Sequence, residues 1–180
     1  MNKPEPPSIV LGALREDDAQ TIHAWRADPS VRDGALGYPF ASSVEGERAW
    51  IRGFAPSGTP QDLCLGVRDA RNDALLGYCQ LRSIDWIART AEFGIVIGAP
   101  ESRGRGIGAQ ALALAVEYAT LHLGLRRLWL RVVGFNTAAI RMYEKAGFQL
   151  EGRLLRHAYR NGQLHDVLIY GREWTARDRP

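Results

Sequence analysis

The chain of 180 residues lacks several features that would place it in a special class of protein. It has no run of about eighteen apolar residues, which excludes a membrane-spanning helix. Its two cysteines, Cys64 and Cys79, lie in apolar runs, which excludes a disulfide framework and favours buried thiols in a reducing compartment. Lysine occurs only as Lys3 and Lys145, and the arginines are scattered without a basic run, so the net charge of +3 does not indicate nucleic-acid binding. We therefore expect a cytoplasmic protein without a membrane or nucleic-acid partner.

Length and composition predict one domain. With 46% hydrophobic residues, 180 residues are enough for one sizeable core and too few for two ordinary domains. The proline-rich start has neither the apolar core nor the cleavage site of a signal peptide. We expect a flexible tail at residues 1–8, a single domain at 9–175 and a short C-terminal tail at 176–180.

Hydrophobic periodicity and turn signals predict the secondary structure. Ser42 and Glu45 fit a capping box before a helix, Asn136 fits a helix cap, and Asn161-Gly162 is a strong hairpin signal. The expected strands are 9–14, 62–68, 75–85, 90–98, 126–133, 149–159 and 164–173. The expected helices are 16–28, 42–54, 110–123 and 136–147. The order βααβββαβαββ predicts an α/β fold with a mixed sheet.

Three alternating glycines, Gly104, Gly106 and Gly108, lie between a strand-like run at 91–98 and the helix expected at 110–123. Glycine leaves the backbone accessible, and the first N–H groups of a helix together with its dipole attract anions. The segment therefore predicts a binding site for a phosphate-containing ligand.

Two common phosphate-binding motifs do not fit this segment. Gly104-x-Gly106-x-x-Ala109 matches a permissive dinucleotide fingerprint, but that fingerprint follows the first strand of a fold and requires an acidic residue about twenty positions later. No Asp or Glu occurs from Tyr118 to Met142. A P-loop requires Lys-Ser or Lys-Thr after the glycines, and neither is present.

A longer pair of motifs fits a different family. Arg103-x-x-Gly106-x-Gly108 is followed about thirty residues later by Asn136-x-x-Ala139-x-x-x-Tyr143-Glu144-Lys145-x-Gly147-Phe148. Together they resemble the GCN5-related N-acetyltransferases (GNAT), and within them the branch of ribosomal-protein N-terminal acetyltransferases and spermidine acetyltransferases. Further marks of that branch are Leu14-Arg15-Glu16-Asp17-Asp18, Ala91-Glu92-Phe93-Gly94, Glu151-Gly152-Arg153, Asn161-Gly162 and Asp166. The resemblance covers residues 9–174.

The resemblance implies a GNAT fold, in which helices flank a mixed, mostly antiparallel sheet with a splayed parallel pair at 90–98 and 126–133. It implies acetyl-CoA as co-substrate, with pantetheine pairing along one splayed strand and Tyr143 as general acid. The implied cofactor-binding residues are Ile95, Val96, Ile97, Arg103, Gly104, Arg105, Gly106, Ile107, Gly108 and Asn136.

Several of these residues also have a purely structural interpretation. Tyr143 fits a core position, Asn136 a helix cap and Arg103 a solvated side chain. Glu92 is the leading candidate for the general base that deprotonates the amine, and equally a structural partner for an arginine. Neither histidine spacing nor a nucleophile elbow indicates a metal or a covalent nucleophile, so we expect none.

The predicted reaction is direct attack of a primary amine on acetyl-CoA in a ternary complex. Acceptors left open are a protein N-terminus and a small amine such as an amino sugar or a polyamine. A polyamine pocket should be rich in carboxylates, but between Gly34 and Pro60 the only acids are Glu45 and Glu47. The alternative is a catalytically silent module that binds acetyl-CoA. Edge strands make a homodimer possible.

Overall fold

The computed structural model describes residues 8–36, 40–54, 59–98 and 102–175. The predicted tails at 1–8 and 176–180 therefore lie outside the described residues, apart from Ser8. The strands are β1 Ile9–Ala13, β2 Leu63–Asp69, β3 Leu75–Asp85, β4 Thr90–Ile97, β5 Arg127–Val133, β6 Gln149–Arg160 and β7 Gln163–Glu173. The helices are η1 Glu16–Asp18, α1 Ala19–Ala27, α2 Pro29–Arg32, α3 Val44–Arg52, α4 Ile107–Glu117, the π-helical η3 Tyr118–His122 and α5 Thr137–Lys145.

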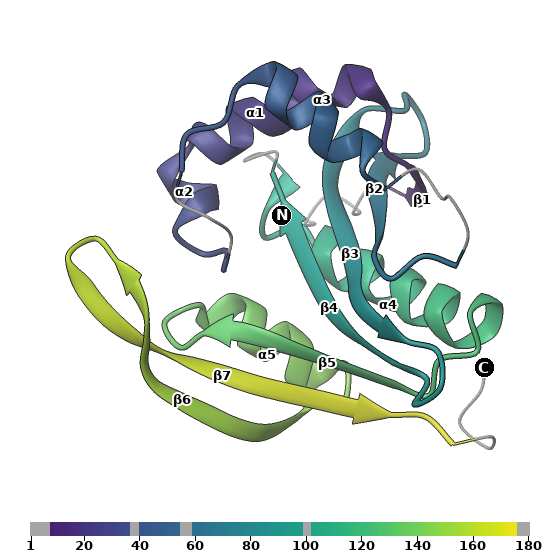
Figure 1. Ribbon diagram of the computed structural model, residues 1–180, viewed down its shortest axis with the longest axis vertical. Coiled ribbons are helices and arrows are strands. Elements are labelled where there is room, and N and C mark those ends of the chain that lie inside the picture. Colours follow the sequence, from purple (N-terminus) through teal and green to yellow (C-terminus); the bar gives the residue numbers. More distant parts are fainter. Residues whose placement is uncertain (1–7, 37–39, 55–58, 99–101, 176–180) are drawn as a thin grey trace, which may run out of the picture.

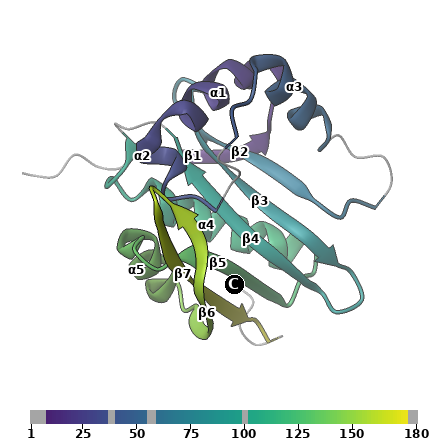
Figure 2. The ribbon, with the colours of Figure 1, turned by 60° about the vertical axis from the view of Figure 1, so that its left-hand side comes forward.

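The seven strands form one sheet in the order β1-β2-β3-β4-β5-β7-β6. Every neighbouring pair is antiparallel except β4 and β5, which are parallel. Figures 1 and 2 show α1–α3 grouped together over one end of the sheet, with α4 and α5 apart from them. The predicted mixed, mostly antiparallel sheet flanked by helices is confirmed.

The two faces of the sheet are covered by different helices. On one face Phe93 and Leu128 pack with Leu112 of α4 and Tyr143 of α5. On the other face Tyr78 packs with residues of α1 and α3. Because side chains alternate along a strand, neighbouring residues of β3 and β4 belong to opposite layers.

Local sequence signals explain most helix ends and turns. Asn136 Oδ1 accepts a hydrogen bond from the Ala139 amide at the start of α5 (3.2 Å), and Gly147 follows the helix with φ +83°. Asn161 and Gly162, at the β6–β7 turn, both have positive φ (48° and 81°), as a two-residue hairpin requires. No helix of the described residues is long and apolar enough to span a membrane.

Two predicted helix starts differ from the structure, and one predicted helix end has a second role. The cap of α3 is Ser43, whose hydroxyl accepts from the Gly46 amide (3.0 Å), and not Ser42. Asp28-Pro29 does end α1, but it also starts α2, because the Asp28 carboxylate accepts from the Ser30 amide (2.8 Å) and proline fits the first helical position. The helix predicted at 110–123 begins earlier, at Ile107, and ends in a π-helical turn.

Both cysteines are free and buried, as predicted. Burial raises the pKa of the Cys79 thiol to about 12 and that of Cys64 above its ordinary value. Both side chains are therefore neutral packing residues near neutral pH.

Candidate active site

Strands β4 and β5 separate part of the way along their length. They pair at only three positions, Thr90 with Arg127, Ala91 with Leu128 and Glu92 with Trp129. Beyond these, β4 stays with β3 as far as Ile97 and β5 stays with β7 as far as Val133 (Figure 1). The predicted splay of these two strands is therefore present, and we call the point after Glu92 and Trp129 the fork.

The part of β4 beyond the fork has free backbone groups. The amide of Gly98 donates to the Leu76 carbonyl of β3 (3.0 Å), so by alternation Val96 also faces β3 while Ile95 and Ile97 face the opening. The carbonyl of Ile97 accepts instead from Arg103 Nε (3.4 Å). Of the three strand residues predicted to bind pantetheine, Ile95 and Ile97 thus turn their amides to the opening, where no described strand pairs with them, and Val96 turns its amide to β3.

The glycine loop leads directly into α4. Gly104 and Gly106 have φ of +69° and +82°, values that other residues rarely adopt, and a Cβ at either position would meet nothing within 4 Å. The first helical bond runs from the Gln110 amide to the Gly106 carbonyl (3.1 Å). The preceding amides, from Ile107 onward, have no acceptor within the helix, and the space in front of the two glycines is open.

Gly108 has a different role from the other two glycines. A Cβ there would lie 3.1 Å from the sulfur of Met142 and 3.7 Å from Ile97 Cγ1. This glycine therefore lets α4 approach α5 and β4 closely. The start of α4 and the helix that carries Tyr143 are thereby held together.

The two loop arginines make contacts within the protein. Arg103 donates to Ser30 Oγ (2.9 Å) and to the Gly98 carbonyl (3.1 Å), which connects the loop to α2 and to the end of β4. Arg105 lies near Asp69 at the end of β2, where it helps the Arg71 hydrogen bonds to lower the pKa of that carboxyl to about 2. Their predicted contacts with a diphosphate stay a prediction.

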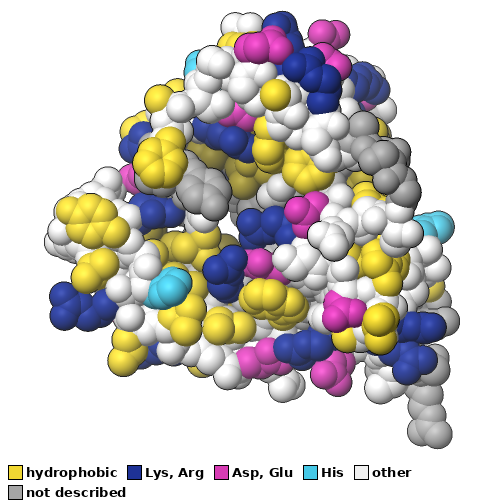
Figure 3. Space-filling view, in the orientation of Figure 1, with side chains coloured by type: hydrophobic (Ala, Val, Ile, Leu, Met, Phe, Trp, Pro, Cys, Tyr) yellow, Lys and Arg dark blue, Asp and Glu magenta, His cyan; other side chains and the backbone are white. Residues whose placement is uncertain are grey.

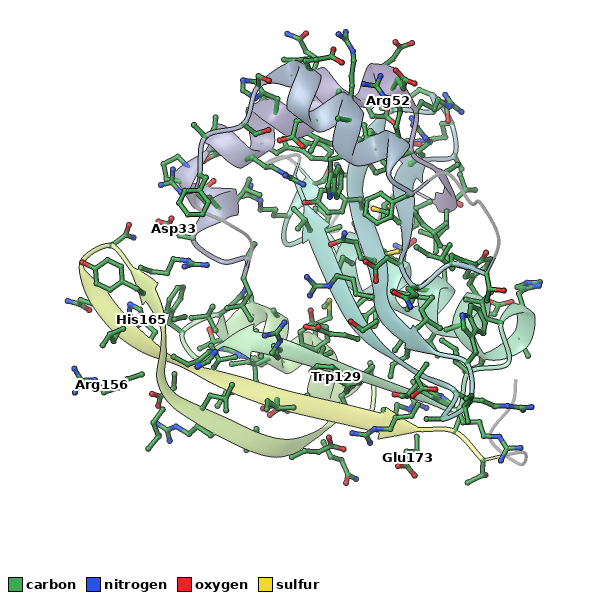
Figure 4. All side chains as sticks on the ribbon, in the orientation of Figure 1. Asp33, Arg52, Trp129, Arg156, His165 and Glu173 are labelled. Carbon is green, nitrogen blue, oxygen red and sulfur yellow. The ribbon has the colours of Figure 1, made fainter. Side chains whose placement is uncertain are left out.

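Asn136 also has a structural role. In addition to capping α5, its Nδ2 donates to the Gly34 carbonyl (3.0 Å), which connects α5 to the segment after α2. The tip of the β6–β7 hairpin contacts the same segment through a hydrogen bond from Asn161 Nδ2 to Asp33 Oδ2 (2.8 Å). Figure 4 shows Asp33 across from the hairpin that carries His165. The cofactor contact predicted for Asn136 is not tested by these bonds.

Tyr143 lies next to the fork. Its ring is 6.5 Å from that of Phe93, the first β4 residue beyond the last parallel pair, and the two rings meet edge to face. The side chain is 5% exposed, and burial raises the pKa of its phenol. Burial is the only cause of this shift, and within the described part of the chain no hydrogen bond engages the hydroxyl. A neutral phenol with an uncommitted O–H is thus placed where the strands separate.

Glu92 lies at the same level on the other face of the sheet. Its Oε1 accepts from Arg82 Nη2 (3.0 Å) and Arg131 Nε (2.9 Å), and its Oε2 from Arg131 Nη2 (3.2 Å). These bonds match the alternative interpretation, a partner for arginines. Two bonds fill the acceptor positions of Oε1, whereas Oε2 keeps one lone pair for an amine or a water.

The sequence reasoning did not select Arg82, Arg131 or Trp129. Arg131 interrupts an otherwise apolar strand, Leu128-Trp-Leu-Arg-Val-Val133, which was a usable signal for a charged group with a specific partner. The partnership itself arises only because β3, β4 and β5 are neighbours in the sheet. Figure 3 shows Lys or Arg and Asp or Glu side chains gathered in a hollow between α1–α3 and β5–β7.

The fold and this arrangement define a class of protein. An open loop of free amides suits a diphosphate, an unpaired strand edge suits an extended amide-containing chain, and a neutral phenol near both suits a leaving thiolate. Coenzyme A combines a diphosphate with an amide chain and a thiol. The site is therefore that of an enzyme that transfers an acyl group from a CoA thioester. Among the residues that the structure describes, no group of three His, Cys, Asp or Glu side chains could hold a metal ion.

Comparison with known proteins identifies the family. A profile of the acetyltransferase (GNAT) domain matches residues 8–149. The spermidine N(1)-acetyltransferase of Escherichia coli K12 is 38% identical over 167 residues, covering 92% of this chain and 86% of the relative. The enzyme of that name from Vibrio cholerae is 30% identical over 159 residues, covering 88% and 89%. A crystal structure of the Vibrio cholerae enzyme with CoA and spermine superposes with a TM-score of 0.83 at 28% identity, covering 92% of this chain and 95% of the other.

This chain therefore belongs to the GNAT acetyltransferase family. It is an N-acetyltransferase that uses acetyl-CoA as its co-substrate and an amine as its acceptor.

The open space at Gly106 leads to a first prediction. In Gly106→Val a branched side chain occupies the space in front of the free amides, and the left-handed backbone costs about 1–2 kcal/mol. We expect the Kd for CoA, measured by calorimetry, to rise at least about tenfold, the loss of one charge-assisted contact. Gly124→Val is the matched control, since Gly124 has φ +67° and open space but follows η3, far from the start of α4. Equal Kd values for the two variants would contradict a diphosphate site at this loop.

Proposed function

We propose that acetyl transfer takes place at the fork, with the thioester between the two faces of the sheet. The observation that carries this proposal is the position of two groups at one level of β4. Tyr143 packs against Phe93 on the α4–α5 face, and Glu92 lies one residue earlier on the α1–α3 face. A thioester in the opening would be reachable by the phenol from one face and by the amine from the other.

The proposed cofactor path uses the free backbone groups. The amides at the start of α4 bind the diphosphate, with Gly104 and Gly106 leaving room for it. The amides of Ile95 and Ile97 bond to pantetheine as an added strand, and one of them can donate to the developing oxyanion. Arg103, Arg105, Ile107, Gly108 and Asn136 position this loop and its helix, and stay candidate contacts of the cofactor.

In the proposed reaction the neutral amine attacks the carbonyl carbon directly. The C–N bond forms, the C–S bond breaks, and the sulfur leaves as a thiolate that receives a hydrogen bond or a proton from the Tyr143 hydroxyl. Because burial raises the pKa of this phenol, it stays protonated at neutral pH. The proton lost by the amine passes to Glu92 Oε2, directly or through a water.

The role of Glu92 as base can be separated from its role in the arginine network by pH. We expect Glu92→Gln to lower kcat about 100-fold at pH 7, the range of general-base effects. The loss should shrink towards pH 10, because a primary amine with a pKa of about 10 then loses its proton to solvent. If kcat is lowered by the same factor at every pH and the melting temperature also falls, Glu92 has a structural role alone.

The acceptor follows less directly from the site. The named relatives make spermidine and spermine the first acceptors to test, and a relative in Bacillus subtilis, 34% identical over 104 residues and 56% of this chain, is described as a putative ribosomal N-acetyltransferase. We propose a small primary amine, because the α2 segment and the hairpin tip meet at one side of the hollow. Release of free CoA thiol with a panel of amines and peptides tests this directly. Turnover of peptides alone would contradict it.

A cytoplasmic location and a homodimer are further proposals. The two buried free thiols support a reducing compartment. The exposed Leu150 and Leu155 on the edge strand β6 support self-association.

A further inference from the structure

We propose that the acceptor carries an oxyanion, a carboxylate or a phosphate, near its amine, and that Arg82 and Arg131 bind this group. The inference rests on the proposed function, because it concerns the acceptor of that reaction. It separates this chain from the acceptor in the names of its relatives, which is a polycation.

The first argument is the charge of the cluster at the fork. Arg82 and Arg131 share one carboxylate, Glu92, so the three side chains carry a net charge of +1. Glu92 is nearly fully buried, whereas the arginine side chains are 36% and 37% exposed. The exposed part of the cluster is therefore cationic.

The second argument is the number of unused hydrogen-bond donors. A guanidinium has five N–H groups, and Glu92 engages Nη2 of Arg82 together with Nε and Nη2 of Arg131. Arg82 Nε is buried and has no partner among the described residues. Two adjacent guanidiniums with spare donors suit an oxyanion, to which arginine binds in a planar, two-pronged geometry.

The third argument is the place of the cluster relative to the reacting carbon. Tyr78 and Val96 pack under α1 and α3, and Arg82 and Glu92, each four residues along, emerge on this same face. A Cβ added to Gly94 would lie 3.7 Å from Arg82 Nη2, so this guanidinium lies over β4 just beyond the fork. Trp129, the register partner of Glu92, lies on β5 at the same level (Figure 4). An oxyanion bound there would be close to an amine that attacks in the opening.

The fourth argument is the state of the acidic residues on α1–α3. Glu45 lies within 4 Å of Arg48 and Arg52. Glu47 is fully buried 3.2 Å from Arg26, and neither of its oxygens has a hydrogen-bond partner among the described residues. The other two are at α2, where Asp33 lies 3.4 Å from Arg32 and Asp28 caps the helix.

A polyamine needs carboxylates to balance several ammonium groups. Glu45, Glu47 and Asp33 lie beside arginines and Asp28 caps a helix, so a triply charged acceptor would meet these arginines in addition to the cationic cluster. A monoamine that carries an oxyanion is not repelled by these arginines, because its net charge is not positive.

The test compares matched acceptors by release of CoA thiol. One pair is 4-aminobutyrate and 4-aminobutyramide, a second is phosphoethanolamine and ethanolamine, and spermidine is the polycation. We expect kcat/KM to be at least about tenfold higher for the anionic member of one pair, the range for a charge-assisted contact. The pair with the larger ratio identifies the oxyanion as carboxylate or phosphate. The ratio should fall as salt is added.

Variants connect this preference to the two arginines. Arg82→Gln and Arg131→Gln should each reduce the ratio about tenfold through KM for the anionic amine. Both arginines also hold Glu92, so any loss of kcat that this causes affects both members of a pair and cancels in the ratio. Arg82→Lys keeps the charge but loses the planar guanidinium, so the kcat/KM ratio should fall less than in Arg82→Gln. Arg48→Gln, on the exposed side of α3, is the control and should leave it unchanged.

Two results would overturn the inference. One is a higher kcat/KM for spermidine than for both anionic amines. The other is that the arginine variants lose kcat/KM equally for the anionic and the neutral amine of a pair. Either leaves the proposed function intact, because acetyl transfer is still observed. Failure of every amine to release CoA thiol from a protein that binds CoA would instead remove the proposed function, and the inference with it.

Discussion

Replacing Tyr143 by phenylalanine should lower kcat by about 100-fold or more, because positioned general acids contribute about 10²–10⁴-fold. The hydroxyl is the only group removed, and the ring contact with Phe93 stays. We expect the Kd for CoA to stay unchanged, since the phenol acts on the leaving thiolate and not on the diphosphate. Steady-state kinetics combined with calorimetry would show this split.

Stability provides an independent check on the same variant. The Tyr143 hydroxyl has no hydrogen-bond partner in the described ranges, so its removal leaves no partner group unsatisfied. The melting temperature of Tyr143→Phe should therefore equal or exceed that of the parent. Tyr118→Phe, at the far end of α4, is the matched control for kcat. A full kcat in Tyr143→Phe would exclude the phenol as general acid.

The pH profile of the parent enzyme should reflect the same phenol. Its pKa is raised by burial, so the protonated form persists beyond the ordinary value of about 10. Activity should rise with pH as the acceptor amine loses its proton, without an alkaline decline below about pH 10. A decline centred near pH 8 would show that a different group supplies the proton.

Much of the fold could be predicted from local patterns. Asn161-Gly162 predicts its turn because only residues that tolerate positive φ fit both positions, and Asn136 predicts the start of α5 through one amide bond. Asp28-Pro29 shows the limit of such signals. The same two residues suit the end of one helix and the start of the next, and packing of Val31 decides that both occur.

The site was harder to predict because its parts are separated in sequence. The fork depends on where β4 and β5 stop pairing, and neither strand contains a local signal for this, so it followed only from the family resemblance. The backbone alternation that turns Ile95 and Ile97 towards the opening and Val96 away from it depends on the register with β3. The cluster of Arg82, Glu92 and Arg131 requires three neighbouring strands.

The largest effect on stability should come from the ion pair that attaches η1 and α1 to the sheet. Asp18 Oδ2 accepts from Arg68 Nη2 of β2 (2.5 Å) and from the Arg15 amide (2.7 Å), and both side chains of the pair are at most 10% exposed. Removal of one partner from a buried pair costs about 3–5 kcal/mol. Arg68 keeps its hydrogen bond to the Asp73 carbonyl (3.0 Å) and a carboxylate oxygen of Asp73 at 3.9 Å, so we expect the lower end of this range. The free energy of unfolding of a domain is about 5–15 kcal/mol, so Asp18→Ala should remove a large share of the stability.

Controls separate this effect from the loss of any carboxylate. In Asp18→Ala the melting temperature should fall by roughly 10 °C, since each kcal/mol corresponds to about 2–4 °C in chains of this length. Glu45→Ala breaks exposed pairs with Arg48 and Arg52 and should leave the melting temperature nearly unchanged, because solvent screens exposed ion pairs. The double variant Asp18→Ala/Arg68→Met should regain part of the loss, because it also removes the buried charge that has lost its nearest carboxylate. Equal melting temperatures for Asp18→Ala and Glu45→Ala would show that burial adds nothing to this pair. The apolar contacts of α1 and α3 with Tyr78 and Cys64 would then contribute more than the pair to holding these helices on the sheet.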